Sequence, residues 1–316
     1  MTFLEELYLR GEATSVARDV LFGVIFELGL GKGPNVLPRC RRSLQGFRRD
    51  DPPVSEDPCP REAAALVTAA LLKDGPLLSV LSGLAFGVQY DLFTRPSETL
   101  NILKEDVVAP RTGAYQGVAV IVAPGPVRAA AAEATARAGL RAPAPSTPAA
   151  VRKRPAARPA KSGEFDDTVL AGLEGLGFEF VPEVLLSLQR AALPGQPLFS
   201  PLTLSEYERH ILKGAELAGL DPLRVTPHSA RHGGASSAMH LELLDLKMIQ
   251  KRGRWLAPRS VKRYEKSGKL LRQVAAIRDK IPDGERLLQA DSRNSLKMQV
   301  IAAANSVRRL RARANM

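Results

Sequence analysis

A short stretch of the chain combines side chains that could bind one anion. His228 and Arg231 follow Pro227 in the run Thr226-Pro-His228-Ser-Ala-Arg231. Proline favours the first turn of a helix, so we expect the imidazole and the guanidinium one turn apart on one helix face. A guanidinium binds phosphate oxygens through two parallel hydrogen bonds, and an imidazole adds a further donor. The spacing therefore predicts a site for an anion such as phosphate.

Two residues further along the chain could contribute to the same site. Trp255 follows Gly253-Arg and offers an indole N–H, which remains a donor across the working pH range. Tyr264 lies nine residues after Trp255, far enough to sit on a following helix and turn its hydroxyl back to the same place. Each residue alone has an ordinary explanation, such as a helix-capping histidine, a core tryptophan or a surface tyrosine. Their order along the chain favours one shared site.

This order resembles the C-terminal motif of the tyrosine recombinase (phage integrase) family. The family pattern is H-x-x-R-H, about two dozen residues, a glycine-containing turn with His or Trp, and a Tyr nine residues later. Here Trp255 lies 24 positions after Arg231, and Tyr264 lies nine positions after Trp255. The family also has an upstream arginine with an acidic residue three positions on, which Arg95 and Glu98 match. The resemblance covers roughly residues 57–275.

The resemblance implies an enzyme that cleaves and rejoins DNA strands in site-specific recombination or integration. Tyr264 is then the nucleophile that forms a 3′-phosphotyrosine, and Lys161 gives a proton to the departing 5′ oxygen. Glu98 then orients the site from a position behind the residues that hold the phosphate. The family's remaining donors, which hold the phosphate and offset its developing charge, correspond here to Arg95, Arg231, His228 and Trp255.

The lysine assignment depends on a turn between two expected strands. Lys161 begins the run Lys161-Ser-Gly-Glu, just before the second strand, as the family's lysine does. Lys153 is the alternative, because an insertion blurs the alignment here. A solvated loop lysine is the ordinary explanation for either residue.

Composition agrees with a polyanionic partner. The chain of 316 residues has a formal net charge of +12 and an isoelectric point near 10.0, which points to nucleic acid. Cys40 and Cys59 are too far apart in sequence for a CxxC site, so neither a disulfide framework nor a zinc ribbon is indicated. The spaced histidines His228, His232 and His240 lack the glutamate of an HExxH motif. We expect neither metal nor cofactor, because arginines provide the positive charge.

Composition also divides the chain into segments. Residues 1–50 read as helices, and a proline-rich acidic linker follows. The basic helix near the end of this segment suits phosphate contacts through Arg39, Arg41, Arg42 and Arg48. The family's DNA-clamping domain is longer than 50 residues, so we expect only part of it here. Residues 57–282 form the expected catalytic domain, and residues 283–316 a basic helical tail.

A segment rich in alanine, proline and arginine, about 126–160, interrupts the catalytic domain. Seven basic residues against Glu133 give it a net charge of +6, half that of the chain. It has no apolar face and is expected to be a disordered insertion. Three interpretations remain open: a loop that binds DNA loosely, a nuclear address, or unselected sequence.

The predicted fold is α+β and mainly α-helical: a DNA breaking–rejoining catalytic fold with a small antiparallel sheet, including strands at 118–122 and 168–171, and a partial helical N-terminal domain. The implied partner is double-stranded DNA, bound by a homotetramer on paired sites and by a monomer otherwise. We expect no membrane segment and an intracellular protein, nuclear in a eukaryote and otherwise in the cytoplasm or nucleoid. The resemblance also fits an origin in a mobile genetic element. The alternatives are a catalytically inactive DNA-binding descendant and a type IB topoisomerase.

Overall fold

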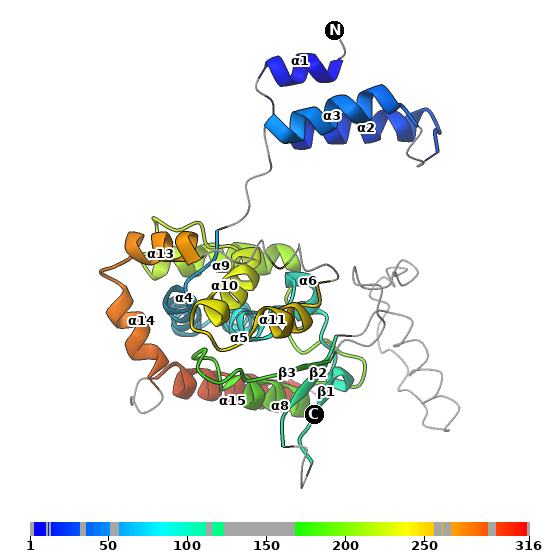
Figure 1. Cartoon of the computed structure of the whole chain (residues 1–316). Coiled ribbons are helices and arrows are strands. Elements are labelled where there is room, and N and C mark those ends of the chain that lie inside the picture. Colours follow the sequence, from blue (N-terminus) through cyan, green and yellow to red (C-terminus); the bar gives the residue numbers. More distant parts are fainter. Residues whose placement is uncertain are drawn as a thin grey trace, which may run out of the picture. The chain divides into compact units, whose positions relative to one another are not determined.

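The computed structural model describes residues 3–10, 12, 14–31, 36–50, 57–111, 116–122, 168–255, 261, 267–289 and 295–314. The chain forms two compact units, Met1–Ser55 and Glu56–Met316. Their boundary falls within the linker that composition indicates. Figure 1 draws both units.

The first unit is a small helical bundle. It contains α1 (Phe3–Leu9), α2 (Thr14–Glu27) and α3 (Pro38–Asp50). Helix α3 is the expected basic helix, and it buries Leu44 and Phe47 in the apolar core of this unit. The other buried core residues are Leu4, Leu7, Ala17, Leu21 and Ile25.

The second unit is built around α4 (Arg61–Asp74) and α5 (Leu77–Leu92), two helices that follow each other in the sequence and pack together. Helix α5 is buried along nearly its whole length, including the polar residues Gln89 and Asp91. A helix that is apolar on all sides belongs in a protein core, which explains its central position.

Further helices surround this pair. Along the chain they are α6 (Pro96–Leu100), the short 3-10 helix Lys104–Asp106, α8 (Val181–Ala191), α9 (Leu204–Leu217), α10 (Pro227–His240), α11 (Leu246–Gly253), α13 (Ser267–Ala276), α14 (Ile281–Leu288) and α15 (Leu296–Ala314). Helix α15 lies beside α8 (Figure 1) and buries Leu296, Val300, Ala304 and Val307 in the main core. The segment 283–316, expected as a basic tail, therefore contributes to the core of the second unit.

One small antiparallel sheet lies at the side of the helices, in the order β1-β2-β3. Its strands are β1 (Val107–Val108), β2 (Ala119–Ile121) and β3 (Thr168–Leu170). Val120 pairs with both Val107 and Val169, so one buried valine from each strand shares a face. The two expected strands are confirmed, whereas β1 was not predicted. A mainly helical α+β protein with a small antiparallel sheet matches the predicted class.

Helices α5 and α10 approach each other closely. A Cβ added at Gly233 would lie 2.0 Å from the Cys59 carbonyl oxygen, and one at Gly234 would lie 2.1 Å from the Tyr90 carbonyl oxygen. No side chain fits at such distances, so this glycine pair allows α10 to pack against α5. The packing brings the N-terminal half of α10 to the turn that follows α5.

Candidate anion-binding site

Helix α10 begins where the sequence predicts. Thr226 is its N-cap and accepts a hydrogen bond from the Ser229 amide at 3.1 Å, with Pro227 in the first turn. Arg231 is buried, with 3% of its side chain exposed, whereas His228 is exposed. Both residues lie on α10, three positions apart, and the shared anion site expected of them stays a prediction.

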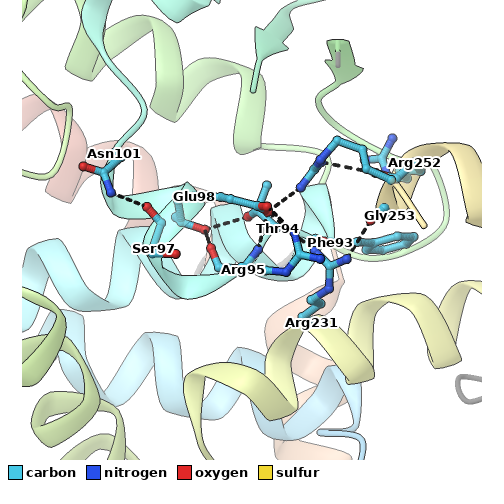
Figure 2. Close-up of polar contacts among 11 residues, drawn as sticks. Phe93, Thr94, Arg95, Ser97, Glu98, Asn101, Arg231, Arg252 and Gly253 are labelled. Atoms are coloured by element: carbon cyan, nitrogen blue, oxygen red, sulfur yellow. Dashed lines mark hydrogen bonds and ion pairs between the residues drawn. The ribbon is translucent and has the colours of Figure 1, made fainter. Parts of the chain in front are cut away.

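Arg231 ties two helix ends together. Its Nη1 donates to the Phe93 carbonyl at 2.5 Å, and its Nη2 donates to the Gly253 carbonyl at 2.6 Å (Figure 2). Phe93 is the C-cap of α5, and Gly253 is the last residue of α11. Helix C-termini carry partial negative charge, so two of them stabilise the buried guanidinium.

Trp255 covers the same guanidinium. The Arg231 Cζ lies 4.8 Å from the centroid of the Trp255 ring, in cation–π geometry. The ring also lies against the turn before it, because a Cβ at Gly253 would be 2.0 Å from the Trp255 Cζ3. Glycine at position 253 is therefore required for the tryptophan to reach Arg231.

Three arginines, Arg95, Arg231 and Arg254, converge on Glu98, and Figure 2 labels the first two of them. The Arg95 Nη1 donates to Oε1 of Glu98 at 2.5 Å, and the Arg95 amide donates to Oε2 at 2.8 Å. The Arg254 Nη2 donates to Oε2 at 2.5 Å, and the Arg231 Nη1 lies 3.6 Å from the same oxygen. The arginines come from separate segments of the chain. Three guanidinium groups around one carboxylate leave a net positive cluster, which suits an anionic ligand.

The charge state of Glu98 is set by the three neighbouring arginines. Burial on its own raises the pKa of Glu98, but Arg254, Arg231 and Arg95 and the Arg95 amide together lower this pKa to about 2. Glu98 is therefore ionised at neutral pH. Its negative charge keeps the arginines together without neutralising all of them.

A second buried ion pair lies beside the cluster. The Arg252 Nη2 is 3.1 Å from Oδ1 of Asp91, and the Arg252 Nη1 donates to the Leu170 carbonyl at 2.8 Å. The Asp91 carboxylate also accepts the amides of Gly172 and Leu173, each at 2.8 Å. Because α5, the end of β3 and α11 meet here, this pair holds the segments that carry the cluster.

Arg252 and Arg254 make contacts that the sequence motif did not predict. Both flank Gly253 in the run Arg252-Gly-Arg-Trp255, so their proximity to the motif was the available signal. Only the three-dimensional arrangement shows that one contacts Asp91 and the other Glu98.

The expected nucleophile and the expected proton donor are not among the described residues. Tyr264 and Lys161 lie outside the described residues, as do the alternative Lys153 and the segment 126–160. Tyr207 is the other tyrosine near the expected motif. It is fully buried and donates to the Gln89 Oε1 at 2.7 Å, so its hydroxyl already has a structural partner.

On the basic helix α3, two of the four arginines expected to contact phosphate, Arg39 and Arg42, are exposed. Arg41 is half-buried, donates to the Val36 carbonyl at 2.8 Å and lies 5.7 Å from the Phe22 ring centroid. The side chain of Arg48 lies outside the described part. Of the expected arginines on this helix, Arg39 and Arg42 are thus the two whose described side chains are exposed.

Within the described residues, no group of three or more His, Cys, Asp or Glu side chains is arranged to hold a metal ion. Nor does any described helix combine the length and the apolar character needed to cross a membrane.

Comparison with known proteins adds no relative. No protein-family model, no curated protein and no solved structure matches this chain.

Proposed function

We propose that this protein cleaves and rejoins double-stranded DNA through a covalent tyrosine intermediate, in the manner of tyrosine recombinases. One observation carries the proposal. Arg95, Arg231 and Arg254 come from three separate segments and meet at Glu98, with Trp255 packed on Arg231. Two of these arginines and the tryptophan belong to the motif that resembles the recombinase family.

The cluster suits a phosphodiester in two ways. The Arg95 side chain is 28% exposed and is the guanidinium most open to a ligand, whereas Arg231 and Arg254 are each 3% exposed. Buried charges act through a low dielectric, so they favour a transition state in which negative charge accumulates. Arg95 is thus the contact group, and the other two contribute positive potential from behind.

The proposed reaction is a transesterification. The Tyr264 hydroxyl gives its proton to solvent water and its oxygen bonds to phosphorus, while the bond from phosphorus to the 5′ oxygen breaks. Lys161 donates a proton to that leaving oxygen. Attack by a 5′ hydroxyl on the phosphotyrosine reverses the step, so the bond energy is retained for rejoining.

The proposed partners follow from the same function. Duplex DNA fits the net charge of +12 and the exposed Arg39 and Arg42 on α3. Recombination on paired sites implies a homotetramer on DNA. The protein then acts where DNA is, in the nucleus of a eukaryote or in the nucleoid.

A second candidate is a DNA-binding descendant without catalysis. One observation favours it: the terminal nitrogens of Arg231 donate to main-chain carbonyls, and its side chain is almost fully buried. In this alternative the arginine cluster stabilises the fold, and the surface charge binds DNA.

A trapping experiment tests the proposal. The protein is incubated with a pool of nicked duplexes of randomised sequence, in which cleavage releases a short fragment and prevents rejoining. Detergent-resistant adducts are isolated, and the linked peptide is identified by mass spectrometry. An adduct on Tyr264 supports the proposal. Duplex binding without any adduct favours the inactive descendant, and relaxation of supercoiled plasmid without paired sites favours a topoisomerase.

A further inference from the structure

Arg254 has a backbone conformation that its residue type disfavours. It is the C-cap of α11 and lies in the left-handed region with φ of 55°. Glycine is the usual residue at such a helix end, and a side chain there costs about 1 kcal/mol or more. Unlike glycine, the arginine at this helix end brings a guanidinium to Glu98.

The contacts of Glu98 show what Arg254 contributes. The two carboxylate oxygens have different partners: Oε1 accepts from the Arg95 guanidinium, and Oε2 accepts from the Arg95 amide and from Arg254. The Arg254 side chain is 3% exposed, and its Nη1 lies 3.4 Å from the Arg252 carbonyl oxygen. A carboxylate held at Oε2 by a buried group has its other oxygen directed at Arg95.

We propose that Arg254 is a positioning residue that orients Glu98 and, through Glu98, fixes the guanidinium of Arg95. What Arg95 then binds rests on the proposed function, but the positioning itself does not. Arg252, two residues earlier, has a separate role, because its guanidinium contacts Asp91, the Leu170 carbonyl and the Phe93 ring.

Three variants separate the side chain from the backbone. Arg254→Gly removes the guanidinium and relieves the left-handed backbone, so the variant is expected to fold. Arg254→Lys keeps a positive charge but loses the planar fork. Glu242→Gly is the matched control, because Glu242 is an exposed residue with φ of 55° and none of the described contacts of Glu98.

The first measurement follows the Glu98 carboxyl carbon by NMR between pH 3 and 7, with its signal assigned by its loss in Glu98→Gln. In the wild type Glu98 stays ionised over this range, since its pKa is about 2. In Arg254→Gly the pKa rises by roughly one unit or more, so the signal titrates within the range. Arg254→Lys restores part of the shift, and Glu242→Gly leaves it unchanged. This pattern would show that Arg254 acts on the Glu98 carboxylate, and the rate measurement then separates positioning of Arg95 from a purely structural ion pair.

The second measurement is the single-turnover rate of DNA adduct formation on the nicked duplex pool. We expect Arg254→Gly to slow this rate by about tenfold or more with DNA affinity nearly unchanged, and Arg254→Lys to recover part of it. A wild-type protein that forms no adduct disproves the proposed function, while the Glu98 titration still decides the role of Arg254. A Glu98 titration that is identical in the wild type and Arg254→Gly, or no recovery with lysine, overturns the inference.

Discussion

The guanidinium of Arg252 contacts both the carboxylate and the main-chain carbonyl of Asp91. Its Nη2 lies 3.1 Å from the Asp91 Oδ1, and its Nε and Nη2 donate to the Asp91 carbonyl at 3.0 and 2.8 Å. Asp91 is fully buried, and burial raises the pKa of its carboxyl group. Asp91 lies four residues before Arg95, and Arg252 three before Trp255, so the pair fixes the distance between two parts of the candidate site.

We predict that Asp91→Asn lowers the free energy of unfolding by roughly 3–5 kcal/mol, because it leaves Arg252 buried without its counter-charge. Urea unfolding measures the effect. Glu183→Gln is the control, since Glu183 pairs with Lys297 at a largely exposed site and should change stability by less than about 1 kcal/mol. Equal losses of unfolding free energy in both variants would show that the buried pair stabilises the fold no more than the exposed pair does.

Glu98 predicts a particular dependence of stability on pH. Its pKa is about 2 in the folded protein and 4.5 as a reference value, so the folded state favours the ionised form. The resulting contribution, on the order of 3 kcal/mol, is fully present above pH 4.5 and is lost as pH falls toward 2. The difference in unfolding free energy between wild type and Glu98→Gln should therefore narrow over that interval. A difference that is constant from pH 7 to 3 contradicts this view of the cluster.

Tyr264→Phe should abolish the covalent DNA adduct and leave equilibrium DNA binding nearly intact, because only the nucleophilic oxygen is removed. Gel analysis in detergent measures the adduct. Tyr207→Phe is the matched control: it loses the hydrogen bond to Gln89, which should cost about 1 kcal/mol of stability, but it should still form the adduct. An adduct that persists in Tyr264→Phe and disappears in Tyr207→Phe reverses the assignment.

Cleavage should proceed with excess EDTA at an undiminished rate. The physical reason is that guanidinium groups at Arg95, Arg231 and Arg254 take the charge-stabilising role that a divalent cation has in other phosphoryl-transfer enzymes. The rate of adduct formation is compared with EDTA and with added Mg²⁺. Activity that vanishes with EDTA and returns with Mg²⁺ contradicts the proposed mechanism.

The helices of the second unit were largely predictable, because apolar periodicity and proline at the helix starts are local signals. The start of α10 at Pro227 is an example. Strand β1 was missed because it has two residues and forms only by pairing with β2. Residues 283–316 were expected as a tail because their arginines dominate the composition, while Val300 and Val307 actually bury one face of α15.

The candidate site was predictable to the extent that its residues follow a spaced motif. Arg95, Glu98, Arg231 and Trp255 do lie together. The sequence could not show that Arg254 would contact Glu98, because this depends on a left-handed backbone at the end of α11 and on the packing of α6 nearby. Nor does spacing alone reveal that Arg231 is buried while His228 is exposed.

The last prediction concerns the alanine- and arginine-rich segment. Ile121 and Thr168 are paired residues at the facing ends of β2 and β3, so whatever connects them only has to close a hairpin. Deleting residues 126–158 leaves residues 122–125 and 159–167 as the connection and keeps Lys161. The deletion should leave the melting temperature unchanged or slightly higher, because a shorter loop loses less entropy on closure, about 0.6 kcal/mol for each halving.

Non-specific DNA affinity of the same deletion should fall, and its dependence on salt should become less steep. The deleted segment carries seven basic residues and one acidic residue, so up to six net positive charges are lost. Each phosphate contact that is lost lowers the slope of log affinity against log salt by about 0.9. A melting curve and a salt titration of duplex binding are measured for both proteins. An unfolded deletion variant would show that the segment is structural, and it would also remove the support for Lys161 over Lys153 as the proton donor.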